Sequence, residues 1–418
     1  MIKRYLLPQD KEVSREVLVL ALPVIFSNLS RVFMSVVDVA MVGHLGPTAL
    51  AATGMGAMLF WGALSFMLGI RTAVQTVSAR RLGQGLFNDC GNAFRNGMVL
   101  ALVFAVPVSI AGWGLAGKFV PFFLVDQIAT DLAIDYVSVI FLGLLFSSIS
   151  FVFQGFYTGI EKTRLHMNVT IFSNGLNVYL NAGLIYGSAG IKEFFSDRFP
   201  AVEWLHLFWA WTDFPALGVL GAAIATLIAS TWMAVHYAFY LFTPAIRSKF
   251  NTARFSLDMV MMKKQISIAW PQGFQEVVIA VGWSFFYKIM GIIGLIELAA
   301  TELVFTIMHA SFMPAIGVGQ ACATLVSKYM GEKKIDYASN SIIESLRIAE
   351  YIMGTMGILF LLIPHFFLSF FTNDPNVITM GSFGLRVLGF LQFVDAIGIT
   401  LWFALSGAGN TLFPAVVE

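Results

Sequence analysis

Long apolar runs, separated by short polar or glycine-containing turns, fill most of the sequence. Ten runs reach the roughly 20 residues that a helix needs to cross a bilayer. We place these runs at 14–40, 48–74, 92–117, 130–157, 164–187, 215–243, 262–288, 296–320, 339–371 and 376–405. Helices satisfy their backbone hydrogen bonds internally, and the runs lack the alternation of barrel strands. The pattern predicts an all-α polytopic membrane protein.

One segment of the chain, 23–85, occurs twice. A shift of 248 residues aligns it without gaps on 271–333, with 12 identities in 63 positions. The identities cluster at glycines and at a Leu-Ala-Ala-Thr block, and the same offset continues downstream. The identical pairs include Gly69 and Gly317, Thr76 and Thr324, Gly83 and Gly331, and Gly159 and Gly407. We interpret this as one duplicated module.

Each copy is expected to hold six spans, which return the chain to its starting side. The two six-helix repeats are then parallel, as in several secondary transporters. The N-terminal lobe is placed at 1–250 and the C-terminal lobe at 251–418. The offset puts the end of the second repeat roughly 80 residues beyond Glu418. We therefore expect a C-terminal truncation, a second lobe lacking its last two helices, and no transport by the 418-residue form itself.

Composition supports a membrane protein, and the charge distribution sets its orientation. Hydrophobic residues make up 58% of the chain, charged residues only 12%, and the mean hydropathy is +0.80. Counting connections from an inside N-terminus, the inner segments carry 18 of the 25 Lys and Arg residues, whereas the outer segments hold Lys118, Lys192 and Arg198. The positive-inside rule then places the N-terminus in the cytoplasm. An aromatic-rich outer segment at 191–215 is expected to be interfacial.

Several ionisable residues fall inside the expected spans. Insertion of such a group costs about 2.5 to 3.5 kcal/mol, so it needs a function or a partner. The acidic residues of this kind are Asp38, Glu276, Glu302 and Asp395, and the basic ones are Arg31, Arg71, Lys288 and Arg386. None of the acidic residues is matched by a carboxylate in the other repeat.

Unsymmetrical carboxylates favour a transporter over a structural protein. Asp38, Glu276 and Asp395 are our candidates for coupling, because a carboxylate in a low-dielectric cavity can exchange a proton or hold Na⁺ and also attracts a cationic substrate. The alternative for each is a salt bridge within the bundle, for example to Arg31 or Lys288. Glu302 is a weaker candidate for the substrate cavity, since it can equally lie near the outer surface.

Amides and prolines supply the remaining candidates. Asn177 and Asn181 lie four residues apart on one helical face, where they can line a polar cavity near Asp38. The alternative is helix packing by hydrogen bonds. Pro23 and Pro271 are repeat partners inside expected helices and are candidate hinges, because proline removes a backbone hydrogen bond. The alternative for Pro23 is a place in the first helical turn, with no bend.

A set of short motifs carries a family resemblance over nearly the whole chain. These motifs are Leu22-Pro23, the stretches 37–46 and 49–52, the stretch 159–164 with sequence GIEKTR, the pair Asn177 and Asn181, and Gly409-Asn410-Thr411. In combination they resemble the multidrug and toxic compound extrusion (MATE) family. Glu276 after Pro271, together with Asp395, resembles its NorM-type branch.

The resemblance implies twelve spans in two lobes and the export of cationic, amphipathic drugs in exchange for Na⁺ or H⁺. It implies proton coupling at Asp38 and cation binding, with Na⁺ as a candidate metal, at Glu276 and Asp395. Asn181 stands where some members carry an aspartate, and Leu391 where NorM-type members carry a tyrosine. A multi-pass protein of the bacterial cytoplasmic (inner) membrane is expected.

The sequence thus predicts a secondary antiporter that works by alternating access. The alternative is a flippase for a lipid-linked oligosaccharide, which is expected to carry a cationic cavity for phosphates, whereas the best intramembrane charges here are acidic. No His-Glu-x-x-His, P-loop or nucleophile elbow is present, so an enzyme is not expected. We expect no cofactor beyond the coupling ion. The expected partners are small organic cations and membrane lipid, without nucleic acid, and the protein is expected to be a monomer.

Overall fold

The computed structural model describes residues 8, 10–124, 126–198, 200–252, 256–372 and 374–417, and these contain helices and no strand. The first repeat region contains α2 (Lys11–Gly43), α3 (Pro47–Gly83), α4 (Phe87–Phe119), η1 (Val120–Phe122), α5 (Gln127–Gly159), α6 (Thr163–Arg198), η2 (Pro200–Trp209), α7 (Gly218–Leu241) and α8 (Pro244–Phe250). The second contains α9 (Met259–Ile293), α10 (Leu295–Gly331), α11 (Ile335–Leu362), α12 (Pro364–Ser369), α13 (Pro375–Ala408) and α14 (Leu412–Val417).

Each of the ten expected spans coincides with a long helix, which confirms the all-α polytopic class. Eight helices, counted over the described residues, are long and apolar enough to cross a membrane: α2, α3, α4 with η1, α5, α7, α10, α11 and α13. The two others, α6 and α9, carry buried amides, among them Asn177, Asn181 and Gln272. The span expected at 339–371 is broken at Ile363, because the residue before Pro364 is driven out of the helical region.

Aspartates begin corresponding helices of the two repeats. The Asp10 side chain accepts hydrogen bonds from the backbone N–H groups of Glu12 and Val13 at the start of α2, and Asp258 does the same for Val260 and Met261 at the start of α9. Asp126 and Asp374 cap α5 and α13. These are standard N-caps, and they start the equivalent helices at equivalent positions.

The aromatic segment folds back on α6. Gly187 has φ 71° and ψ 166°, which interrupts the helix where the span was expected to end. Beyond it, Trp209 stacks on Tyr179 with ring centroids 4.9 Å apart and donates its indole N–H to the Tyr179 carbonyl at 2.9 Å. The segment therefore covers the end of α6 and does not add another span.

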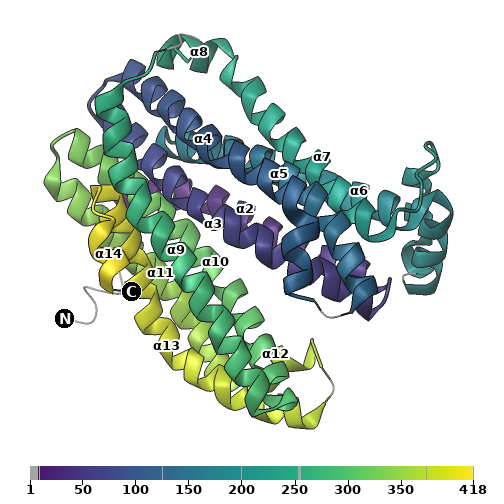
Figure 1. Cartoon of the computed structure of the whole chain (residues 1–418). Coiled ribbons are helices and arrows are strands. Elements are labelled where there is room, and N and C mark those ends of the chain that lie inside the picture. Colours follow the sequence, from purple (N-terminus) through teal and green to yellow (C-terminus); the bar gives the residue numbers. More distant parts are fainter. Residues whose placement is uncertain are drawn as a thin grey trace.

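The helices form two arms that meet at one end and diverge at the other (Figure 1). Helices α2 to α7 make one arm, and α9 to α13 make the other. The first helix of each arm begins in the core of the other arm. Val13, Val17 and Ile25 of α2 pack in a core with α10 and α11, while Met261 and Ile268 of α9 join the core of the first arm. The boundary at residue 250 stays a prediction, since this exchange ties the two halves together.

Duplicated glycines let the arms approach closely. A side chain at Gly69 would meet the Ala269 carbonyl of α9, and one at the repeat partner Gly317 would meet the backbone of Ile25 in α2. In the same way, a side chain at Gly83 would meet the Lys328 carbonyl, and one at Gly331 would meet the Arg80 carbonyl. Only glycine permits these backbone contacts without displacement. We call this contact region the closed end.

Duplicated threonines add hydrogen bonds at the closed end. Thr76 Oγ1 of α3 donates to the Ser406 carbonyl of α13 at 3.0 Å. Its repeat partner Thr324 Oγ1 of α10 donates to the Thr158 carbonyl of α5 at 3.4 Å. Several identities between the repeats therefore lie where one arm touches the other.

Candidate functional site

The contacts between the arms stop partway along α2 and α3. Of the described hydrogen bonds between the arms, the one furthest along α2 joins Asn28 Nδ2 to the Met313 carbonyl at 3.5 Å. On the α3 side, Phe66 packs against Gly273. Asp38 lies ten residues beyond Asn28, about 15 Å along the helix. The candidate residues beyond these contacts therefore lie on the diverging parts of the arms (Figure 1).

Asp38 belongs to a polar network inside the first arm. Asn181 Nδ2 of α6 donates to Asp38 Oδ1 at 2.5 Å and also contacts Asn177 Oδ1 at 3.1 Å. Asn177 in turn donates to Thr226 Oγ1 of α7 at 3.4 Å. Asp38 is half-buried, while both asparagines are buried at 2% exposed or less. The network links α2, α6 and α7 and leaves the carboxylate at its accessible end.

The helical spacing of α6 builds this network. Asn174, Asn177 and Asn181 lie on one face, and Asn174 Nδ2 donates to Ser30 Oγ of α2 at 2.9 Å. This hydrogen bond packs α6 against α2. Helix packing is the alternative role that the sequence analysis kept open for the amides of this helix. Asn181 instead faces an ionisable group. An amide can donate to a carboxylate and, turned over, accept from a carboxylic acid. Asn181 thus suits both protonation states of Asp38.

A second group of charges lies where the arms separate. Glu276, half-buried on α9, is one turn beyond Gly273 and within electrostatic range of Arg71 of α3. Arg31 of α2, one turn beyond Asn28, is also within electrostatic range of Arg71. Arg71 is 9% exposed, and its Nε has no hydrogen-bond partner among the described residues. The charge of Glu276 therefore offsets part of a two-arginine cluster.

The remaining acidic candidates are on two other helices of the second arm. Asp395 is half-buried on α13, and Glu302 is exposed on α10. The described residues contain no group of three or more His, Cys, Asp or Glu side chains that could hold a metal ion. A Na⁺ site at Glu276 and Asp395 therefore stays a prediction, as does the cavity-lining role of Glu302.

Both candidate hinge prolines lie within long helices. Pro23 is buried about three turns beyond the start of α2, so a place in the first turn is excluded. Pro271 has the equivalent position in α9. Ser27 Oγ donates to the Pro23 carbonyl at 2.9 Å. The hinge role itself stays a prediction.

Sequence reasoning missed the polar contacts that join the arms. Lys328 Nζ of α10 pairs with Glu161 Oε1 of the first arm at 2.7 Å. Its repeat partner Arg80 donates from Nη2 to the Ala408 carbonyl at the end of α13 at 2.9 Å. Gln75 Nε2 donates to the Gln320 carbonyl and to Thr324 Oγ1, both at 2.9 Å. The repeat contained the signal, since a cation occurs at the equivalent position of both copies.

Comparison with known proteins agrees with this architecture. The family model described as MatE matches residues 23–182 and 274–418. The chain is 26% identical to a probable multidrug resistance protein NorM of Thermotoga maritima, covering 100% of this chain and 85% of the relative. It is 25% identical to the multidrug resistance protein NorM of Burkholderia vietnamiensis, over 94% of this chain and 81% of that protein.

A solved structure has the same fold. It is described as the outward-facing conformation of a multidrug resistance MATE family transporter of the MOP superfamily, and it matches with a TM-score of 0.84 at 19% identity. The match covers 97% of this chain and 85% of that structure. The family model accounts for most of the chain in two segments, one in each repeat, and this protein therefore belongs to the MatE family.

Proposed function

We propose that this protein is a secondary antiporter that exports cationic, amphipathic compounds in exchange for Na⁺ or H⁺. The observation that carries the proposal is the Asp38–Asn181 pair, a half-buried carboxylate held by a buried amide on a part of α2 that lies beyond the contacts between the arms. Family membership and the names of the multidrug resistance relatives support the substrate class.

The exchange follows from competition for the carboxylates. In the proposed cycle, a proton or Na⁺ neutralises Asp38, Glu276 and Asp395 from the diverging side while the closed end is formed, and an organic cation leaves. A neutralised carboxylate no longer attracts the organic cation. The attraction that is lost is large, because desolvated charge pairs interact far more strongly than solvated ones. Separation of the arms at the closed end then exposes the same groups to the other side, with Pro23 and Pro271 as the hinges.

The closed end is assigned to the cytoplasm. Its helix ends carry Arg80, Arg81 and Lys328, and the neighbouring connections contribute further basic residues. The basic positions Lys3, Arg4 and Arg254, counted on the same side, lie outside the described residues. By the positive-inside rule this end would face inward, which supports an outward-open state and a cytoplasmic N-terminus for a protein of the bacterial inner membrane.

Export of a fluorescent organic cation from cells lacking their own pumps tests the proposal. We expect the Asp38→Asn and Glu276→Gln variants to lose at least about tenfold in export rate, the factor for about 1.4 kcal/mol. Asp135→Asn, at an exposed acidic residue of α5 outside the candidate set, serves as the charge-matched control and should change export less than twofold. Normal export by both the Asp38 and the Glu276 variant would contradict the proposed mechanism.

One observation favours a second candidate function, that of a flippase for a lipid-linked oligosaccharide. Arg31 and Arg71 lie within electrostatic range of each other where the arms separate, which supplies the cationic site that such a substrate needs. Under the antiporter proposal, Arg31→Gln leaves the translocation of a phosphate-linked lipid at background. Translocation of such a lipid that depends on Arg31 would favour the flippase instead.

The remaining functional expectations are also proposals. We infer that the protein catalyses no covalent reaction, requires no cofactor beyond the coupling ion, acts as a monomer and binds no nucleic acid.

A further inference from the structure

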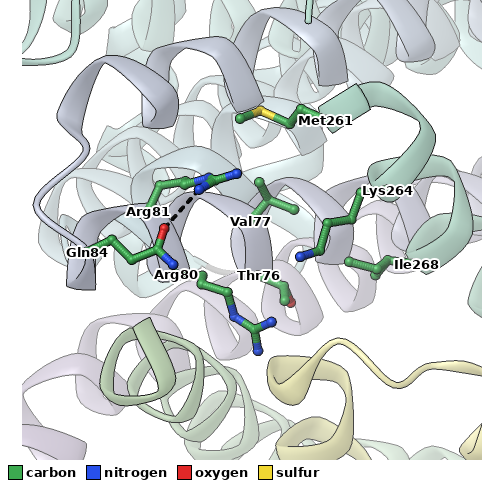
Figure 2. Close-up of a pocket in the computed structure, with 8 residues that line it drawn as sticks. All are labelled: Thr76, Val77, Arg80, Arg81, Gln84, Met261, Lys264 and Ile268. Atoms are coloured by element: carbon green, nitrogen blue, oxygen red, sulfur yellow. Dashed lines mark hydrogen bonds between the residues drawn. The ribbon is translucent and has the colours of Figure 1, made fainter. Parts of the chain in front are cut away.

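A small cavity lies between the arms at the closed end. Its volume is about 60 Å³, room for a few waters or one phosphate-sized group. Its walls come from the last turns of α3 and the first turns of α9, one helix from each arm. The lining residues are Thr76, Val77, Arg80, Arg81, Gln84, Met261, Lys264 and Ile268 (Figure 2).

Three cations line this cavity. Lys264 is within electrostatic range of both Arg80 and Arg81. Its amine makes no ion pair or side-chain hydrogen bond in the part of the chain that the structure describes, and Figure 2 shows it pointing towards Thr76. Arg80 uses Nη2 on the Ala408 carbonyl, while its Nε is buried without a partner among the described residues. The exposed Lys264 amine is therefore available to an anion.

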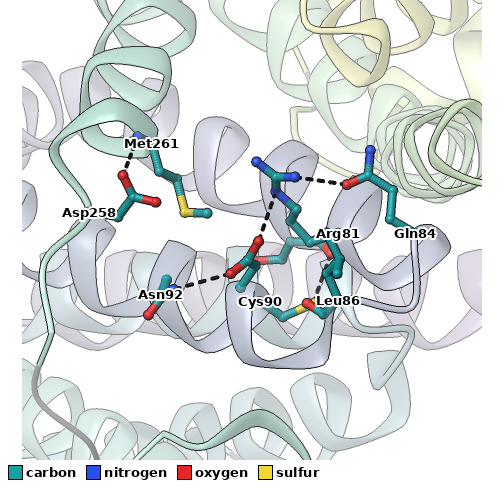
Figure 3. Close-up of polar contacts among 9 residues, drawn as sticks. Arg81, Gln84, Leu86, Cys90, Asn92, Asp258 and Met261 are labelled. Carbon is teal, nitrogen blue, oxygen red and sulfur yellow. Dashed lines mark hydrogen bonds and ion pairs between the residues drawn. The ribbon is translucent and has the colours of Figure 1, made fainter.

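Acidic neighbours neutralise only part of this charge. Arg81 is 3.6 Å from Asp89 and donates to Gln84 Oε1 at 2.9 Å (Figure 3). Asp89 also accepts a hydrogen bond from Asn92 at 3.3 Å. Asp258 uses its carboxylate to cap α9. The contacts of Asp89 therefore account for Arg81, whereas no carboxylate of the described residues forms an ion pair with Arg80 or Lys264.

A second cavity lies on the same α3–α9 contact, further along both helices from the closed end. Its volume is about 260 Å³, and apolar side chains line it throughout. They come from α3, α4 and α9 and are Phe66, Ile70, Leu100, Val103, Phe104, Ile266, Ala269 and Trp270. A basic cavity at headgroup depth and an apolar one at acyl depth along the same pair of helices fit an amphiphile with an anionic head.

We propose that the α3–α9 cavity binds the phosphate group of an anionic membrane lipid and that bound lipid holds the closed end together. Basic pockets between membrane helices on the cytoplasmic side recognise such headgroups, and arginine suits phosphate oxygens. Because α9 begins in the core of the first arm and continues into the second arm, the lipid binds more tightly when α3 and α9 are in contact. By linkage it then stabilises that conformation. Only this conformational effect rests on the proposed alternating access.

Lipid binding to the purified full chain tests the site directly. The probes are phosphatidylglycerol, phosphatidylcholine and inorganic phosphate, and the readouts are lipid retention by native mass spectrometry and the melting temperature. We expect phosphatidylglycerol to bind several-fold more tightly than phosphatidylcholine. Lys264→Gln should weaken it about fivefold, the factor for roughly 1 kcal/mol per basic residue.

Lys263→Gln is the matched control, because it removes the same charge from the neighbouring exposed position, outside the cavity lining. It should change phosphatidylglycerol affinity less than twofold. Equal losses at Lys263 and Lys264 would reduce the effect to general surface charge and overturn the site. If Lys264→Gln fails to fold, Arg80→Gln, which removes the other cavity-lining cation that no described carboxylate pairs with, gives the same comparison. Stabilisation by inorganic phosphate equal to that by lipid supports the anion site and overturns its assignment to lipid.

Discussion

Asp38 and Asn181 show how a charge is kept within a membrane protein. Asp38 is half-buried, and the described contact that supports it is an amide fixed in turn by Asn177 and Thr226. Hydrogen bonds to charged groups contribute about 1.5 to 3 kcal/mol. A carboxylate supported by a neutral amide is free to exchange its counter-ion, whereas one in a tight salt bridge is not.

Removal of the Asn181 amide should therefore impair exchange. We expect Asn181→Leu to lower the affinity for the exported cation about tenfold, because the Asp38 carboxylate loses its donor. Asn174→Leu is the matched control, since Asn174 is a buried amide on the same face of α6 that bonds to Ser30 and not to Asp38. Equilibrium binding of a fluorescent cation measures both. Equal losses in the two variants would assign the amides to packing alone.

At the scale of single helices, α2 and α9 are equivalent elements with different chemistry. Both begin at a capping aspartate and carry a proline about three turns later. Beyond the proline, α2 carries Asp38 and α9 carries Glu276. The shared features maintain the fold, and the differing ones supply the candidate site.

We predict that Pro23 in α2 acts as a hinge. Pro23→Ala restores a backbone donor and a regular helix, so it should keep or raise the melting temperature while lowering export at least about fivefold. Pro107→Ala in α4 is the control, because Pro107 is also inside a long helix but outside the α2 and α9 pair. Unchanged export by Pro23→Ala would show that Pro23 is not a hinge.

Most of the long helices and their approximate bounds were predictable from the sequence. Hydrophobic run lengths located the ten long helices, because spanning a bilayer fixes helix length. The break at Gly187 also fell where the apolar run ended. The break at Ile363 was not predicted, since the apolar run continues through Pro364 and hides it.

The site was predictable only in part. The spacing of Asn177 and Asn181 indicated a shared face, and the structure places that face against Asp38. The partners Thr226 and Ser30 lie on other helices, and periodicity within one helix carries no information about them. The proximity of Arg71 to Glu276 was missed for the same reason, since it depends on how the two arms pack.

At the scale of the whole molecule, the repeat identities describe an interface. Gly69 and Gly317, and Gly83 and Gly331, are the positions where one arm meets backbone of the other. A duplicated module that packs against its copy must retain the small residues at that contact, whereas its cavity walls are free to differ. This explains why the repeats agree at the closed end and differ at Asp38, Glu276 and Asp395.

The closed end should fail when a side chain enters the contact. Gly69→Val places carbon atoms against the Ala269 carbonyl, so we expect the arms to separate there and the distance between spin labels on α3 and α9 to increase. Gly62→Val is the matched control, because nothing lies within 4 Å of a side-chain carbon at that position on the same helix. A label distance that Gly69→Val leaves at the wild-type value would contradict the assigned contact.

The central claim is that the protein exchanges an organic cation for Na⁺ or H⁺ through unsymmetrical carboxylates. Its most direct measurement is uphill uptake of ethidium into proteoliposomes of purified protein, driven by an imposed Na⁺ or proton gradient. We predict uptake against the ethidium gradient that stops when the driving gradient collapses and that Asp38→Asn abolishes. Ethidium movement that proceeds only downhill, or uptake that Asp38→Asn leaves intact, would contradict the account.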